Sequence, residues 1–175
     1  AMGLCFLPEY INEQKGRVIC VIGDGGMQMN IQELQTLKHY NLKLKSFILN
    51  NHSYGITHQF QLTNYGGRYL ASGPDGYSVP DFKDIAHAYG IHSRRINNMT
   101  HLTHKIKEVL DYPDAVVCDV DLGTYTTYEP RIFGWKTPIE DSFPYISREE
   151  FKENMIIKPY DGWENPAMPG GGEVG

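Results

Sequence analysis

The sequence predicts an α/β fold, a three-layer sandwich in which helices flank a mainly parallel sheet. Apolar runs at residues 18–22 and 115–120 predict buried strands of a parallel sheet, and residues 45–49 predict a further strand. Segments with the three-to-four spacing of amphipathic helices alternate with these runs, and each run stops at polar or glycine residues. Such alternation is typical of parallel α/β sheets.

The first half of the chain predicts one βαβ unit. The run at residues 18–22 ends in a tight turn at residues 23–26, and a helix is expected from residue 31 to residue 40. The second strand, at residues 45–49, ends in Asn50 and Asn51. A strand, a helix and a strand within about thirty residues form the unit that joins parallel neighbours.

The second half predicts a long exposed loop and then two more helix–strand pairs. Residues 65–80 are rich in Gly, Pro and Ser, which favours the loop. Helices are expected at residues 80–90, closed by Gly90, and at residues 100–110. The strands are expected at residues 93–96 and 115–120.

The chain divides by sequence pattern into three parts. Residues 1–123 are expected to form the α/β domain, residues 124–160 an extension or lid, and residues 161–175 a flexible tail. Tyr125 and Tyr128 could line such a lid, and packing of the extension on the sheet explains them equally well.

Composition excludes several classes of protein. The 175 residues are 41% hydrophobic and carry a formal net charge of -5, unlike disordered chains or proteins that coat nucleic acid. No apolar run is long enough to cross a bilayer, and the cysteines are three, widely spaced and without a C-x-x-C pair. A cytoplasmic location is expected.

Two strand ends carry the polar residues of interest. Asp24 follows the first strand among glycines, and Asn51, Ser53 and Gly55 follow the second. Ligands bind at the carboxyl edge of open α/β sheets. A carboxylate, an amide oxygen and a backbone carbonyl are hard donors that suit Mg²⁺ shared with phosphate oxygens.

A simpler interpretation stays open, in which Asp24 caps a helix and Asn50-Asn51 forms a turn. Nicotinamide binding fits poorly, because Gln28 stands where the third glycine of G-x-G-x-x-G belongs, and no Gly-Lys-Ser/Thr of a P-loop is present.

Several blocks resemble one known family. Gly23-Asp24-Gly25, followed some two dozen residues later by Asn50-Asn51, resembles the thiamine diphosphate signature. Residues 23–37, 48–56, 80–91 and 138–151 resemble, in the same order, the diphosphate-binding domain of acetolactate synthase-like enzymes. The resemblance covers residues 1–160 and implies the thiamine diphosphate-binding fold.

The resemblance also implies roles for individual residues. Asp24, the Asn51 side chain and the Ser53 carbonyl would bind Mg²⁺. Met2 would prop the cofactor in its bent shape. The remaining cofactor-binding residues contribute glycine-rich loops and backbone N–H groups for the diphosphate: Gly23, Gly25, Gly26, Gly55 and Ile56.

The reaction implied by the resemblance is decarboxylation of a 2-oxo acid, by family habit pyruvate, followed by addition to a second carbonyl compound. Enzymes of this type take an activating glutamate from a pyrimidine-binding domain or another subunit. Glu33 is expected to support the fold instead. A homodimer or tetramer is therefore expected, and FAD is a further expectation for a domain outside this chain.

Three positions depart from the family pattern. Phe60 falls where acetolactate synthases carry a tryptophan that shapes the acceptor pocket, and Thr57 and His58 beside it are unusual. Ile56, Thr57 and Phe60 are the expected substrate pocket, and His58 is a candidate proton relay. The acceptor stays open: acetyl transfer to a keto-sugar is one alternative, and a non-catalytic cofactor-binding or regulatory module is another. The helix expected at residues 8–15 is also short.

Overall fold

The computed structural model describes residues 1–11, 16–124, 138 and 140–166. The chain divides into two compact units, residues 1–127 and 128–175. The expected lid residues Tyr125 and Tyr128 and residues 167–175 of the expected tail lie outside the described part.

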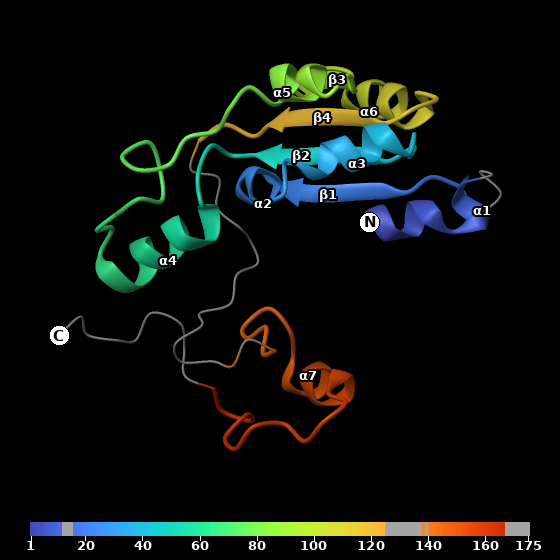
Figure 1. Ribbon diagram of the computed structural model, residues 1–175. Coiled ribbons are helices and arrows are strands. Elements are labelled where there is room, and N and C mark those ends of the chain that lie inside the picture. Colours follow the sequence, from blue (N-terminus) through green and yellow to red (C-terminus); the bar gives the residue numbers. More distant parts are fainter. Residues whose placement is uncertain (12–15, 125–137, 139, 167–175) are drawn as a thin grey trace. The chain divides into compact units, whose positions relative to one another are not determined.

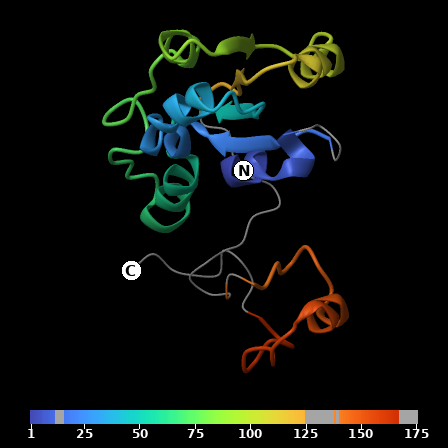
Figure 2. The same ribbon diagram turned by 45° about the vertical axis from the view of Figure 1, so that its right-hand side comes forward.

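The first unit contains a four-stranded, all-parallel sheet. Its strands lie in the order β1 (Ile19–Gly23), β2 (Lys45–Asn50), β4 (Val116–Asp121) and β3 (His92–Ile96). Figure 1 shows β1, β2 and β4 pointing the same way, toward the side on which α4 (Gly55–Tyr65) lies, and Figure 2 agrees. The sheet and its helices confirm the predicted α/β class.

Successive residues of the central strands pack on opposite faces of the sheet. Phe47 of β2 belongs to one core cluster and Ile48 to the other, and Val116 and Val117 of β4 alternate in the same way. Helices cover both faces: η1 (Met2–Phe6), α2 (Asp24–Met29), α3 (Glu33–His39) and α5 (Phe82–Ala88) contribute to one cluster, and α6 (Leu102–Asp111) to the other. This accounts for the apolar residues of β2 and β4. The prediction of a buried strand at residues 18–22 was wrong for one face of the sheet, because Ile19 and Val21 of β1 are 47% and 63% exposed there.

The connection from β1 to β2 differs from the prediction. No open turn separates strand from helix, because α2 begins at Asp24 directly after Gly23. A break at residues 30–32 then separates α2 from α3. The glycines at residues 25 and 26 favour a loop, so the sequence analysis assigned the first turn of α2 to a turn instead of a helix. Asp24 in that turn is compatible with a helix, because a carboxylate there faces the positive end of the helix dipole.

The region after β2 contains a helix that the sequence analysis missed. Residues 55–65 form α4, which ends at Gly66 in the left-handed conformation. The connection that follows is only partly the exposed loop that was expected, because Ser72 and Tyr77 are buried. A backbone hydrogen bond of 2.9 Å from Tyr54 N to Ser72 O ties this connection to the start of α4.

The later helices follow the prediction. The Asp81 side chain caps α5 by accepting from Lys83 N at 2.8 Å, and Gly90 follows that helix with a positive φ of 66°. The short N-terminal helix is described as α1 (Pro8–Ile11).

The second unit has its own small core. Helix α7 (Arg148–Asn154) is capped by Ser147, and Phe151 packs against Tyr160 and Trp163. The buried Asp141 carboxylate accepts two hydrogen bonds of 2.8 Å from the Arg148 guanidinium and a third from Tyr160.

Candidate active site

The parallel pairing of β1 and β2 brings the two predicted strand ends together. Gly23 pairs with Leu49 in the register, so Asp24 and Asn51 both follow the same edge of the sheet. All three expected metal ligands are buried there: Asp24 is 3% exposed, Asn51 5% and Ser53 3%. Burial of a carboxylate beside two other polar groups demands a compensating partner.

Polar atoms of these three residues face one another. One atom of the Asn51 amide group lies 2.8 Å from the Ser53 carbonyl oxygen and 3.2 Å from Asp24 Oδ1. If that atom is nitrogen, it donates to both oxygens; if it is oxygen, three acceptors converge, which is stable only around a cation. Asp24 Oδ2 and Ser53 Oγ are also buried without a hydrogen-bond partner among the described residues. With the Asn51 amide oxygen toward the other two oxygens, the donor set fits a Mg²⁺ ion.

The candidate set contains only one carboxylate. Across residues 1–11, 16–124, 138 and 140–166, no three His, Cys, Asp or Glu side chains are grouped to hold a metal ion. A site at this edge thus depends on amide and carbonyl oxygens, which are ligands that Mg²⁺ accepts alongside water and phosphate.

Close packing restricts the start of α2. A Cβ atom on Gly25 would lie 2.7 Å from Cε1 of Tyr54, and one on Gly26 would lie 3.1 Å from Cγ1 of Ile22. Gly23 differs, because open space surrounds its Cβ position. A side chain at either position would therefore displace its neighbours, so packing favours glycine at both predicted diphosphate-binding positions.

The loop between β2 and α4 is held by its own polar groups. The Asn50 side chain accepts from His52 N at 3.2 Å and donates to the buried Asp119 at 3.0 Å. His52 has a positive φ of 56°, and its Nε2 lies 3.1 Å from Asp121 Oδ1. Asn50, Asp119 and Asp121 were not predicted as site residues. They set the turn that aims Asn51 and Ser53 at Asp24.

Helix α4 carries the predicted substrate pocket. Ile56 and Phe60 lie one turn apart, with 75% and 39% of their surface exposed, and Thr57 is exposed between them. His58 points into the protein instead: its ring stacks on Tyr69 at 3.8 Å, and Nδ1 lies 3.2 Å from Ser72 Oγ. The Gly55 N–H, a predicted diphosphate donor, donates to Ser53 O at 2.9 Å in this structure.

Two other predicted residues have structural environments. Met2 is half-buried in η1 and packs against the core cluster that includes Met27 of α2. Glu33 begins α3, is exposed, and accepts a hydrogen bond of 3.0 Å from Thr36. The structural role expected for Glu33 stays a prediction.

Tyr77 is a site residue that sequence analysis missed. It reaches α2 from about fifty residues away and accepts a hydrogen bond of 3.0 Å from Gln28. Burial raises the pKa of Tyr77 well above its ordinary value, and the neighbouring Asp24 carboxylate raises that pKa further. The phenol therefore keeps its proton and can donate it. No local sequence signal marks this residue.

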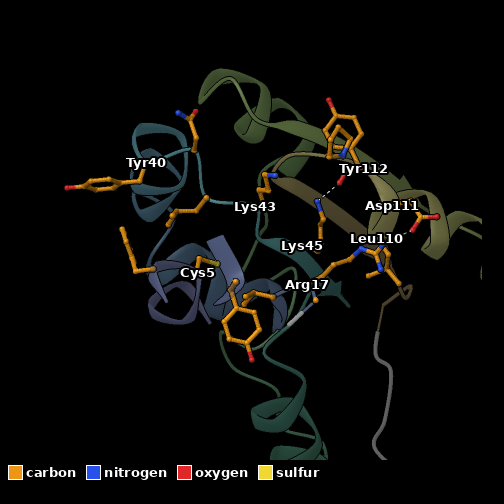
Figure 3. Close-up of a pocket in the computed structure, with 15 residues that line it drawn as sticks. Cys5, Arg17, Tyr40, Lys43, Lys45, Leu110, Asp111 and Tyr112 are labelled. Atoms are coloured by element: carbon orange, nitrogen blue, oxygen red, sulfur yellow. Dashed lines mark hydrogen bonds and ion pairs between the residues drawn. The ribbon is translucent and has the colours of Figure 1, made fainter. Parts of the chain in front are cut away.

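A cavity of about 460 Å³ opens at the opposite, amino-terminal edge of the sheet, where it is bordered by Arg17, Lys43 and Lys45 (Figure 3). Two of these cations have partners at the end of α6. Lys45 Nζ donates to the carbonyls of Tyr112 and Asp114, and Arg17 pairs with Asp111 at 2.8 Å. These contacts have a structural role: they link the start of β2 to the turn after α6, and the segment before β1 to the last residue of α6.

Sequence comparisons bear on this geometry. Residues 1–120 match the family described as thiamine pyrophosphate enzyme, C-terminal TPP binding domain. The acetolactate synthase large subunit of Pyropia yezoensis is 40% identical over 147 residues, which cover 83% of this chain and 22% of that protein. The acetolactate synthase large subunit of Haemophilus influenzae is 37% identical over 103 residues, 59% of this chain and 18% of that protein.

The chain thus spans about a fifth of the length of the curated relatives it matches. No helix in the described part of the chain is long and apolar enough to cross a membrane. The family match covers more than half of the chain and includes Asp24, Asn51 and the carboxyl ends of β1 and β2. The chain belongs to the family of thiamine pyrophosphate enzymes, as a C-terminal TPP binding domain.

Proposed function

We propose that this chain supplies the diphosphate- and Mg²⁺-binding half of an acetolactate synthase-like enzyme. The whole enzyme would decarboxylate a 2-oxo acid, which we take to be pyruvate, and join the remaining fragment to a second carbonyl compound. The observation that carries the proposal is the burial of Asp24, Asn51 and Ser53 side by side, with one atom of the Asn51 amide group within 3.2 Å of Asp24 Oδ1 and 2.8 Å of the Ser53 carbonyl oxygen, in a domain of this family. The names of the relatives support the reaction class.

The residues of this chain would bind and orient the cofactor. Asp24 Oδ1, the Asn51 amide oxygen and the Ser53 carbonyl would hold Mg²⁺, and backbone N–H groups at the starts of α2 and α4 would face the diphosphate. When bound, thiamine diphosphate supplies a thiazolium ring that acts as an electron sink for the loss of CO₂. Ile56 and Phe60 would contact the substrates, because both stand exposed on the first turns of α4.

In this proposal, a second domain or subunit completes the active site. It would bind the pyrimidine ring of the cofactor and contribute the activating glutamate, in a homodimer or tetramer. The exposed apolar side chains of α4 support such a contact, because Ile56, Leu62 and Tyr65 are 75%, 45% and 52% exposed. A cytoplasmic location stays a prediction, and so does a flavin in a domain outside this chain.

The test of the proposed function is a product assay on the full-length protein. With pyruvate, thiamine diphosphate and Mg²⁺, we expect CO₂ release and a carboligation product that both require metal and cofactor. Cofactor binding without CO₂ release would instead favour a non-catalytic module. Carboligation that appears only when a keto-sugar is added would favour the sugar-directed alternative.

A matched pair of variants tests the acceptor pocket. Phe60→Trp is expected to change the ratio of products formed with two competing acceptors while CO₂ release continues, because the larger ring would occupy acceptor space on α4. Thr63→Trp, an exposed position on the same helix, serves as the control. Product ratios that move equally in both variants would contradict the assignment of Phe60.

A further inference from the structure

Tyr77 occupies a special position beside the candidate metal site. Its side chain is buried, with 8% of its surface exposed, and its ring packs on that of Tyr54 with 4.1 Å between the centroids. The hydroxyl lies 3.5 Å from the Cβ position of Gly25, the residue that follows Asp24. A residue from the distant connection after α4 thus reaches the start of α2.

Backbone hydrogen bonds hold Tyr77 in position within the connection after α4. Tyr77 N donates to Gly73 O at 2.7 Å, and Gly76 N donates to the same oxygen at 3.0 Å. Ser72 O, one residue earlier, accepts from Tyr54 N at 2.9 Å. Backbone hydrogen bonds therefore fix the turn that delivers the phenol, and they fix it to the loop that holds Ser53.

The hydrogen bonds around Tyr77 do not use the proton of its own hydroxyl group. Gln28 Nε2 donates to the Tyr77 oxygen at 3.0 Å and also to the Ser78 carbonyl at 3.2 Å. The amide nitrogen has two protons, and both are used, so the phenol oxygen must act as an acceptor toward Gln28. The phenol proton is then available for a different acceptor.

The Asp24 carboxylate provides an acceptor that lacks a donor. Its Oδ1 faces the Asn51 amide at 3.2 Å, whereas Oδ2 is buried without a hydrogen-bond partner among the described residues. A buried carboxylate oxygen without a partner is costly, and a neutral phenol beside it is the kind of donor that relieves the cost.

We propose that Tyr77 is a positioning residue of the metal site. When the metal binds, its hydroxyl, held by Gln28, would donate to Asp24 Oδ2, which has no hydrogen-bond partner among the described residues, and thereby turn Oδ1 toward the Asn51 amide and the Ser53 carbonyl. The proposal rests on the proposed function, since it assumes that Asp24 binds Mg²⁺. Groups that orient a ligating carboxylate in this way typically change metal affinity by about 10–100-fold when they are removed.

The test compares Tyr77→Phe with Tyr40→Phe in the full-length protein, together with any subunit needed for cofactor binding. Phenylalanine keeps the ring that packs on Tyr54 and removes only the hydroxyl. Tyr40 is 58% exposed and borders the cavity at the amino-terminal edge, so its variant controls for loss of a phenol. Calorimetry measures the Kd of Mg²⁺ at saturating thiamine diphosphate, and then the Kd of thiamine diphosphate at saturating Mg²⁺.

We expect Tyr77→Phe to raise the Kd of Mg²⁺ by about 10–100-fold, with the Kd of thiamine diphosphate at saturating metal and the urea midpoint of the metal-free protein close to wild type. An unchanged Kd for Mg²⁺ would overturn the proposal. So would a rise confined to thiamine diphosphate, because the hydroxyl would then contact the diphosphate instead. Failure of the wild-type protein to bind either ligand would contradict the proposed function itself.

Discussion

Two buried aspartates, one in each unit, have opposite surroundings. Asp141 in the second unit is fully buried and saturated: Arg148 donates to both of its oxygens at 2.8 Å, Tyr160 donates at 2.8 Å and Phe143 N at 3.0 Å. Asp24 in the first unit is 3% exposed, yet its Oδ2 has no hydrogen-bond partner among the described residues.

The difference separates a structural carboxylate from a ligand-binding one. A buried charge with a full set of donors and a counter-charge is compensated within the fold. A buried carboxylate that faces an amide and a carbonyl instead lacks compensation, and a cation would provide it. The sequence marks Asp24 by its place directly after an apolar strand, but the donors that saturate Asp141 are visible only in the structure.

The largest effect is expected for Asp24→Ala. It should abolish Mg²⁺-dependent binding of thiamine diphosphate, because even changes beyond the ligands themselves cost about 10–100-fold in metal affinity. The metal-free protein should be as stable as wild type or more so, since an uncompensated buried carboxylate is removed. Calorimetry and urea unfolding check the two expectations. Asp84→Ala, an exposed acid in the first turn of α5, is the control; unchanged affinity in Asp24→Ala would mean that the metal site is elsewhere.

The opposite pattern is expected for Asp141→Ala. It leaves the Arg148 guanidinium, 18% exposed, without its counter-charge, and loss of one partner of a buried pair costs about 3 kcal/mol. Hydrogen exchange of the α7 amides should become faster by the corresponding factor. Asp161→Ala, whose side chain is 97% exposed, should leave exchange in α7 unchanged. Equal protection of α7 in the wild type and Asp141→Ala would contradict a structural role for Asp141.

A smaller effect is expected for Asn50→Ala. The change leaves Asp119 Oδ1 and the His52 N–H without the partner seen here, which costs about 1–2 kcal/mol of unfolding free energy. Urea unfolding measures this loss. Asn64→Ala removes only an exposed hydrogen bond within α4 and is the matched control. A result in which both variants lose the same free energy would show that Asn50 does not hold the metal-ligand loop.

The smallest effect is expected when the pH is lowered and the protection of α7 is measured. The Arg148 guanidinium holds the pKa of Asp141 below its ordinary value. A carboxyl whose pKa is lower in the folded state stabilises that state above the unfolded pKa, about 3.9, and this contribution is lost as pH falls through the lower folded value. Protection of α7 should therefore weaken below about pH 4 in the wild type. Asp141→Asn should show less pH dependence there, and an identical pH profile would contradict the pairing.

The strands and their edge could be predicted because each strand carries its own signal. Residues 18–22 before Asp24 are apolar throughout, and the strand before Asn51 contains the apolar residues 47–49. Parallel pairing through one connection brings the ends of these strands to the same side of the sheet. The residues that bind the metal in our proposal follow those ends directly. Fold class and candidate ligands were accordingly within reach of the sequence.

The other features of the fold and the site could not be predicted, because they depend on long-range contacts or have mixed local sequence signals. Helix α4 was missed because its residues include few regularly spaced apolar side chains, and the glycines at residues 25 and 26 concealed the start of α2. Tyr77 and Asp119 reach the edge from about fifty and seventy residues away in sequence, through hydrogen bonds to Gln28 and Asn50. Nothing near either residue in the chain indicates its partner.

The most direct test of the metal site is a crystal structure of the protein with thiamine diphosphate and Mn²⁺, which replaces Mg²⁺ and scatters anomalously. Our account predicts one anomalous peak within about 2.2 Å of Asp24 Oδ1, the Asn51 amide oxygen and the Ser53 carbonyl, with Asn51 oriented oxygen-first. A peak away from these atoms, or bound cofactor with the Asn51 nitrogen donating to Asp24, would contradict it.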